Sequence, residues 1–166
     1  MRSPRAHRRI AAVVAALAVA LAGCGAEDAG LGSGTPDLHV SPARSSAPVA
    51  GASQLVLAIE NRGDGDDRLV GADTDAAIAV EVHRTVVEDD GRAVMRLLED
   101  IVLPAGGTVR FQPGGLHLMV VVPDERVVVG GTFEVTLRFE RSAPITVTAD
   151  VVELLDLIET DGEGSG

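Results

Sequence analysis

Four side chains of this sequence could together bind a soft metal ion: His83, Met95, His117 and Met119. Imidazole nitrogen and thioether sulfur form an unusual ligand set. Methionine sulfur is too soft for calcium, magnesium or ordinary zinc chemistry, and it favours Cu(I). All four residues fall between Val80 and Met119. We therefore interpret this stretch as a candidate copper site.

The elements that must position these residues are short strands. After Pro48 the sequence has short runs of Val, Ile, Leu and Thr separated by Gly, Pro, Asn and Asp, which is typical of many strands joined by turns. No convincing helix pattern appears before a short segment at 153–159. We expect strands at 54–60, 68–71, 76–87, 93–98, 108–112, 116–122, 126–129, 132–140 and 145–152, and the segment 101–107 should end a strand in a turn. About nine strands in one domain predict an all-β fold, an antiparallel sandwich or Greek-key barrel.

Alternation along these strands predicts which side chains face the core. The expected inward residues are Ile78, Val80, Val82, Leu116, Leu118 and Val120. His83, His117 and Met119 would then face outward together with Glu81. Met95 follows a turn at Gly91, where the chain can double back beside the strand of His83. Four ligands from three neighbouring segments could close a shallow site.

Neutral ligands would leave the charge of a bound Cu(I) unbalanced, so nearby acids could compensate. Glu81 and Glu88 are the candidates. With the only cysteine, Cys24, outside this region, no thiolate is available. A blue-copper redox centre needs a thiolate and is disfavoured, whereas a site without one suits a carrier that releases its metal.

The amino-terminal segment predicts export and lipid attachment. A basic start and an apolar run at 10–22, too short to span a bilayer, predict a signal peptide over residues 1–23. The sequence Leu-Ala-Gly-Cys ending at Cys24 is similar to the lipobox of bacterial lipoproteins. We expect acyl chains on Cys24, a flexible tether over 24–47 with a first strand near 37–40, a β domain over 48–155 and an acidic disordered tail over 156–166.

Composition excludes several classes of function. The chain carries a formal net charge of −11 and has no lysine, tryptophan or tyrosine, which disfavours nucleic-acid binding and lysine-dependent phosphate loops. There is no Gly-x-Ser-x-Gly or HExxH motif, so we expect no enzymatic activity. Asp64, Asp66 and Asp67 resemble half of a calcium loop but lack its downstream glutamate, so a solvated turn is expected.

The spacing of the four candidate ligands resembles the periplasmic copper chaperone family PCu(A)C. That family has a histidine usually followed by methionine, then ten residues, a methionine, twenty-one residues and His-x-Met. His83, Met95, His117 and Met119 reproduce every spacing. Segments such as Leu-Pro-Ala-Gly-Gly at 103–107 and Pro-Gly-Gly-Leu-His-Leu-Met at 113–119 are also similar, and the resemblance covers about 54–152. Arg84 stands where the family usually has a methionine after the first histidine. Successive side chains of a strand face opposite sides, so Arg84 should face away from His83.

The resemblance implies a cupredoxin-like β-barrel that binds Cu(I) through two histidines and two methionines. It further implies delivery of copper to the dinuclear centre of cytochrome c oxidase or to another copper chaperone. With the lipobox, it implies a monomer anchored by lipid on the outer face of the cell membrane or in the periplasm. The alternative is a structural or interaction β-sandwich lipoprotein of the cell envelope that binds no metal.

Overall fold

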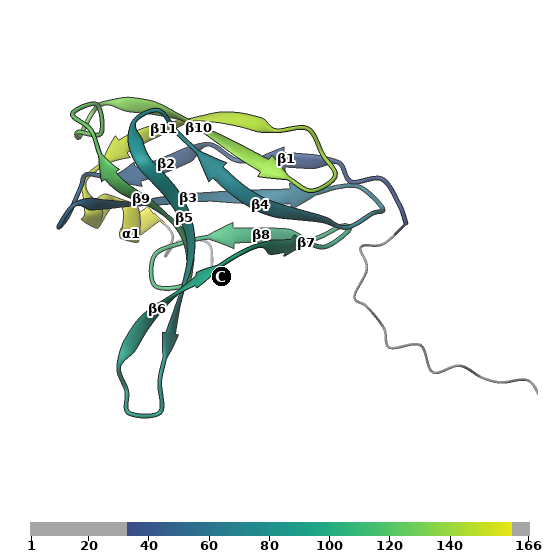
Figure 1. Cartoon of the computed structure of the whole chain (residues 1–166), viewed down its shortest axis with the longest axis horizontal. Coiled ribbons are helices and arrows are strands. Elements are labelled where there is room, and N and C mark those ends of the chain that lie inside the picture. The colour runs from purple at the N-terminus through teal and green to yellow at the C-terminus, as the bar shows by residue number, and fades with distance from the viewer. Residues whose placement is uncertain (1–32, 161–166) are drawn as a thin grey trace, which may run out of the picture. The chain divides into compact units, whose positions relative to one another are not determined.

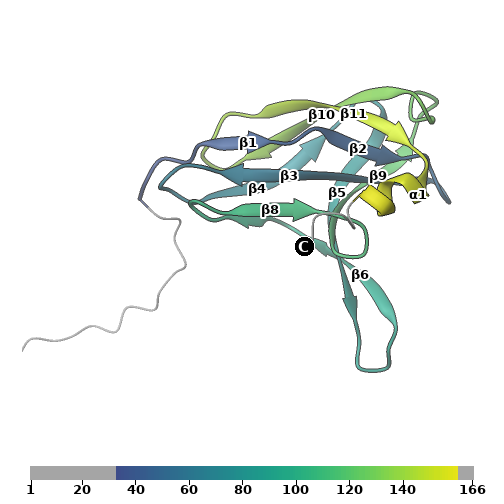
Figure 2. The same cartoon turned by 180° about the vertical axis from the view of Figure 1, so that it is seen from behind.

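The structure is a computed structural model that describes residues 33–160 (Figures 1 and 2). The predicted signal peptide, Cys24 and the last six residues lie outside this range. The described elements are β1 (Leu38–Val40), β2 (Ala43–Ser46), β3 (Ala52–Asn61), β4 (Asp67–Asp73), β5 (Ala77–Val87), β6 (Ala93–Leu98), β7 (Ile101–Leu103), β8 (Thr108–Phe111), β9 (Leu116–Pro123), β10 (Thr132–Phe139), β11 (Ile145–Val152) and α1 (Leu154–Thr160).

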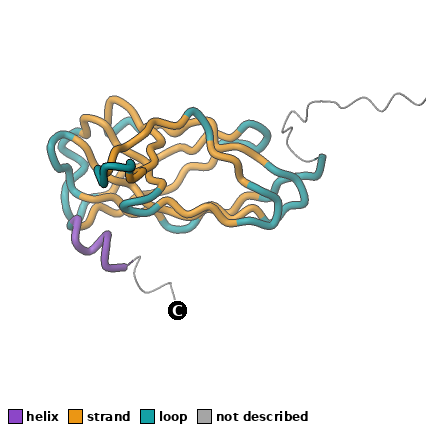
Figure 3. The backbone as a smooth tube through the Cα atoms, turned by 90° about the horizontal axis from the view of Figure 1, so that it is seen from below, coloured by secondary structure: helices purple, strands orange, loops and turns teal. Residues whose placement is uncertain are grey.

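Seven strands close into a barrel in the order β5, β9, β3, β2, β11, β10 and β4. The ring closes where Ala72 of β4 pairs with Val80 of β5. β1 and β8 pair with β3, β7 pairs with β4, and β6 pairs with β5. Figure 3 shows how strands make up most of the described chain, with the short helix α1 at one end. The predicted all-β, cupredoxin-like fold is confirmed. One pair, β2 with β11, is parallel, so the expected antiparallel arrangement is not complete.

The core of the barrel follows the predicted alternation along the central strands. Leu55 of β3, Leu118 of β9 and Val82 of β5 are neighbours across the sheet and are buried. Ile78 is an exception, since it is 77% exposed. β9 pairs with β5 on one side of Ile78, but on the other side β4 joins β5 only through Ala72 and Val80, so no strand is paired beside Ile78 at this seam. The prediction that Ile78 faces the core was therefore wrong.

Strands β5 and β6 form a hairpin that projects from the barrel (Figures 1 and 2). Their pairing runs from Val82 with Leu98 to Val87 with Ala93. The turn closes at Gly91, whose φ of 83° is readily adopted only by glycine. Because β6 pairs with β5 alone, this hairpin carries its residues to the edge of the sheet.

The structure corrects the predicted tether. The first strand expected near 37–40 is present as β1, but residues 43–46, expected to be flexible, form a second strand, β2. β2 lies between β3 and β11, and its Ala43 and Ser45 are buried, so it is an integral barrel strand. Its four residues include only one apolar side chain, Ala43, which is why the pattern gave no strand signal there.

Two segments near the carboxyl end also differ from expectation. Residues 126–129, predicted as a strand, form turns in which Val127 N–H donates to Asp124 and Gly131 N–H to Val128. Val127 is fully buried and contributes to the core from a loop. In the sequence its run of apolar valines therefore resembles a strand. The helix α1 reaches Thr160 and buries Leu157, so residues 156–160 of the predicted disordered tail are helical. Within residues 33–160 there is no helix with the length and apolarity to cross a membrane.

Candidate metal-binding site

The register of three strands brings the four candidate ligands to one face of the sheet. His83 of β5 lies directly opposite His117 of β9. Met119 lies two residues further along β9, opposite Glu81. Met95 of β6 lies opposite Thr85 of β5, two residues beyond the histidine of that strand. Because residues opposite each other and residues two apart share a face, all four side chains belong to the outer surface of the barrel.

The two histidines form the centre of this face. Their ring centroids are 6.0 Å apart and the rings are tilted by 35°. The side chain of His83 is 14% exposed, whereas His117 as a residue is 1% exposed. His117 was predicted to be on the solvent-facing side, and it does point away from the barrel core. Its burial corrects the expectation of an exposed residue, because neighbouring parts of the chain cover it.

Each imidazole forms a hydrogen bond through one of its ring nitrogens, and its other ring nitrogen has no hydrogen-bond partner. Glu81 Oε2 lies 2.8 Å from His83 Nε2, and the carbonyl oxygen of Gly115 lies 3.1 Å from His117 Nδ1. Carboxylate and carbonyl oxygens only accept hydrogen bonds, so these two ring nitrogens carry the hydrogen. His83 Nδ1 and His117 Nε2 are buried and lack any hydrogen-bond partner, and in the neutral form of each ring they carry the lone pair. Lone-pair nitrogens oriented in this way are what a metal ion requires.

The protonation of His117 also suits a metal ligand. Burial lowers the pKa of His117 below the ordinary histidine value, and the positive charge that His83 carries when protonated lowers it further. The hydrogen bond to Gly115 partly opposes this shift. The imidazole is thus neutral at neutral pH, so an incoming cation need not displace a proton.

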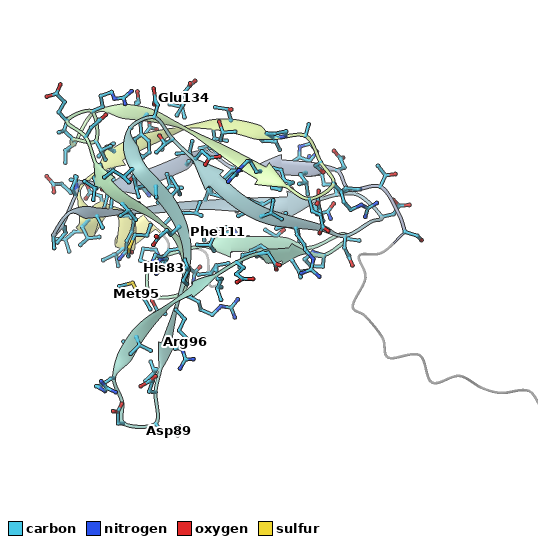
Figure 4. All side chains as sticks on the ribbon, viewed as in Figure 1. His83, Asp89, Met95, Arg96, Phe111 and Glu134 are labelled. Atoms are coloured by element: carbon cyan, nitrogen blue, oxygen red, sulfur yellow. The ribbon has the colours of Figure 1, made fainter. Side chains whose placement is uncertain are left out.

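The methionines flank the histidine pair from two sides. Met119 is half-buried between β3 and β5, with Gln54 and Glu81 opposite it. Met95 is 54% exposed on the hairpin, and Figure 4 shows it beside His83. One sulfur therefore lies within the barrel surface and the other on the projecting arm. A metal held here would be reached from the side of Met95.

The two acids considered from the sequence have different surroundings. Glu81 holds His83 directly, as described above. Glu88 instead accepts hydrogen bonds from Arg92 and Arg96 at the end of the hairpin. Of the two, only Glu81 is placed to orient a candidate ligand. Arg84 is exposed and alternates away from His83, as predicted.

Asp64, Asp66 and Asp67, which resemble half of a calcium loop, do not form a cation site. Asp64 and Asp66 accept hydrogen bonds from the backbone N–H groups of Thr35 and Ala105. Asp67 is fully buried. Within residues 33–160 no group of three or more His, Cys, Asp or Glu side chains could hold a metal ion. On the histidine face the two methionines can add thioether sulfur to the two imidazoles, and such a donor set fits soft Cu(I).

Sequence reasoning missed one residue of this face, Gln54 of β3. It lies opposite Met119, and its side-chain Oε1 is buried without a partner. A glutamine at a half-buried position within a strand rich in apolar residues was a visible signal. Its proximity to the methionine, however, depends on the pairing of β3 with β9.

The fold is that of a PCuAC domain, and comparisons with known proteins also place the chain in a lipoprotein family. The chain belongs to the LpqE-like family, described as "Putative lipoprotein LpqE-like", whose model matches residues 37–151. A relative from Leifsonia xyli subsp. xyli, named "Putative lipoprotein Lxx21020", is 29% identical over 143 residues, covering 82% of this chain and 86% of the relative.

Solved structures of PCuAC domains have the same fold. A copper-bound PCuAC domain from PmoF2 matches with a TM-score of 0.59 and 27% identity, over 70% of this chain and 92% of that domain. The solution structure of CuI-DR1885 from Deinococcus radiodurans matches with a TM-score of 0.56 and 27% identity, over 69% of this chain and 77% of the other. The resemblance inferred from the ligand spacing is thereby confirmed.

Proposed function

We propose that this protein is a lipid-anchored, non-enzymatic Cu(I) chaperone on the outer side of the cell membrane or in the periplasm. His83, Met95, His117 and Met119 bind the metal. The observation that carries the proposal is the pair of buried, unpartnered imidazole nitrogens on the same face as two methionines. The structural similarity to the copper-bound PCuAC domain from PmoF2 also supports the proposal.

The chemistry of the donor set favours Cu(I) over other ions. Two neutral imidazoles and two thioethers supply soft ligands and no charge, and Cu(I) tolerates low coordination. Glu81 provides a nearby negative charge through His83, which it also keeps in the required tautomer. The four ligands come from strands that pair directly, so the face is largely formed before the metal arrives.

The geometry also suits release. No thiolate is present among the described residues, and Met95 is exposed on a hairpin that pairs along one edge only. An acceptor can therefore approach the metal from the side of Met95 and exchange ligands one at a time. The recipient we propose is the dinuclear copper centre of cytochrome c oxidase or another copper chaperone, and the protein acts as a monomer anchored through Cys24.

An anaerobic titration with Cu(I) against a chromogenic chelator tests the proposal, with the full chain purified in detergent. We expect one tight equivalent, which is lost when His117 and Met119 are both replaced by alanine. The control is His39→Ala, a histidine of β1 that pairs with Glu60 near the far end of β3. It lies about 20 Å along that strand from Gln54, and its replacement should leave copper binding intact.

Circular dichroism of the double variant must still show a β-rich fold. If the folded double variant keeps the wild-type Cu(I) affinity, the ligand assignment is wrong. If the wild-type protein does not compete with the chelator at all, the copper function is wrong. The structural or interaction lipoprotein described above would then be the better hypothesis.

A further inference from the structure

A groove lies on the side of the β5–β6 hairpin that faces away from the histidines. The face of β5 that packs into the barrel core at Val82 continues beyond the core, and Arg84 is its next residue. Figure 4 shows Met95 and Arg96 of β6 on opposite sides of the hairpin. The groove has a volume of about 460 Å³. Its apolar walls come from β6, β7, β8 and β9 and consist of Leu98, Ile101, Val102, Val109 and Leu116.

The walls of this groove are apolar but only partly covered. Leu98, Val109 and Leu116 pack against the core from one side, and Val102 is 44% exposed. Among the described strands, β6 pairs only with β5, β7 only with β4 and β8 only with β3, so no further strand closes over the groove. Its volume falls within the range of about 300–1,000 Å³ that is usual for small-molecule sites. A small apolar ligand would fit the groove.

The charged residues of the groove leave one guanidinium uncompensated. Arg84 lies directly opposite Arg96, and like charges at opposite positions destabilise a strand pair. Arg96 is neutralised by Glu88, with Nη2 and Oε1 3.2 Å apart. Asp100 also lines the groove, but its carboxylate pairs with Arg68 at 3.1 Å. Arg84 itself has no hydrogen bond or ion pair with any of residues 33–160. The groove therefore combines apolar walls with a cation that lacks an anion.

This combination matches a ligand that has an aliphatic chain and a carboxylate. The planar guanidinium of arginine can donate two parallel hydrogen bonds to a carboxylate, and apolar walls favour the removal of an aliphatic chain from water. We propose that the groove binds a single-chain fatty carboxylate. Its carboxylate pairs with Arg84 and its chain lies along Leu98, Val109 and Leu116. The bound anion would also offset the repulsion between Arg84 and Arg96.

This site is separate from the candidate metal site. Arg84 and His83 are successive residues of β5, so their side chains face opposite sides of the sheet. The groove contains none of the four candidate metal ligands. The proposal therefore does not depend on copper binding, and neither function needs the other to be correct.

Photolabelling of the full chain in a neutral detergent tests the proposal. The probe is palmitate with a diazirine within its chain, and labelled peptides are identified by mass spectrometry after irradiation. We expect saturable labelling of the groove walls within residues 98–116. Arg84→Gln should raise the concentration for half-maximal labelling at least about tenfold, because a charge-assisted pair is lost. Arg84→Lys keeps the charge and should recover part of this loss. The methyl ester of the probe has no charge, so it should label wild type and Arg84→Gln equally weakly.

Arg110→Gln is the matched control. Arg110 of β8 also has no hydrogen bond or ion pair with the described residues, but it alternates away from Val109 and does not line the groove. Its replacement should leave labelling unchanged. The proposal is overturned if folded Arg84→Gln is labelled like wild type, if the methyl ester labels wild type as tightly as the acid does, or if the label does not saturate within the groove.

Discussion

Two groups of buried polar residues in this protein differ in how well their hydrogen bonds are satisfied. In the first group, Asn61 uses its whole amide: Oδ1 accepts from the N–H groups of Asp37 and Gly63, and Nδ2 donates to the carbonyls of Gly65 and Leu103. In the second group, on the histidine face, three buried acceptors have no partner. The first group holds loops to the barrel, and the second is available to a ligand.

Asp67 shows how completely the first group is satisfied. Its carboxylate accepts hydrogen bonds from the backbone N–H groups of Arg68, Arg141 and Ser142. Burial alone would raise the pKa of Asp67, but these hydrogen bonds, together with one from the Ser142 hydroxyl, outweigh burial and lower the pKa below its ordinary value. A buried charge of this kind stabilises the fold only while every partner remains.

The comparison suggests how to tell structural from functional polar residues in a small barrel. Satisfied groups contribute to stability and offer nothing to a ligand. Unsatisfied groups reduce stability and persist where a ligand repays the cost. Substitutions in the two groups should therefore have opposite signatures.

The largest stability effect is expected from Asp67→Ala. The change leaves three partly buried N–H groups without their acceptor, and we expect a loss of about 3 kcal/mol or more in the free energy of unfolding. Urea unfolding followed by circular dichroism measures it. Asp64→Ala is the control, because that side chain accepts one hydrogen bond at an exposed position. A loss below about 1 kcal/mol for Asp67→Ala would contradict the proposed contrast.

A smaller effect is expected at Glu81, on the copper face. Glu81→Ala removes the acceptor that holds His83 in its tautomer, and we expect Cu(I) affinity to fall about 10–100-fold. Glu81→Gln keeps an oxygen acceptor and should recover part of this loss. Glu88→Ala is the matched control, because the Glu88 carboxylate accepts hydrogen bonds from Arg92 and Arg96 at the end of the hairpin. Equal affinities for the Glu81→Ala and Glu88→Ala variants would show that the hydrogen bond to His83 is irrelevant.

The copper-free protein should tolerate His117→Leu, in contrast to Asp67→Ala. The substitution removes a buried ring nitrogen that has no partner, and the Gly115 carbonyl still accepts the backbone N–H of Thr85. We expect the free energy of unfolding to change by less than about 1 kcal/mol, or to increase. Urea unfolding in the presence of a copper chelator measures it. A loss as large as that of Asp67→Ala would show that His117 is mainly a structural residue.

The smallest expected effect is a pH dependence that separates the two groups. The pKa of His117 is lower in the folded protein, so the unfolded chain binds a proton first and stability falls as pH drops below about 6.5. The lowered pKa of Asp67 gives stability that is present above about pH 4 and is lost as pH falls further. Unfolding curves at several pH values should show both steps, and His117→Leu should remove only the upper one.

The sequence alone was sufficient for most strands and for the four candidate ligands. Alternation correctly predicted Val82, Leu118 and Val120 as core residues, because a two-residue period depends only on local backbone geometry. It failed where burial depends on distant parts of the chain. β2 has little apolar character and is held by β3 and β11, while Val127 lies in a loop that fills the core.

What the sequence determined by itself was the identity and spacing of two histidines and two methionines, and hence the soft character of the candidate site. Only the tertiary structure decided that His83 lies opposite His117, that His117 is buried, and that Gln54 joins their face. The physical reason is strand register. A shift by one residue would move every side chain of a strand to the other face, and register is set by the packing of the whole barrel.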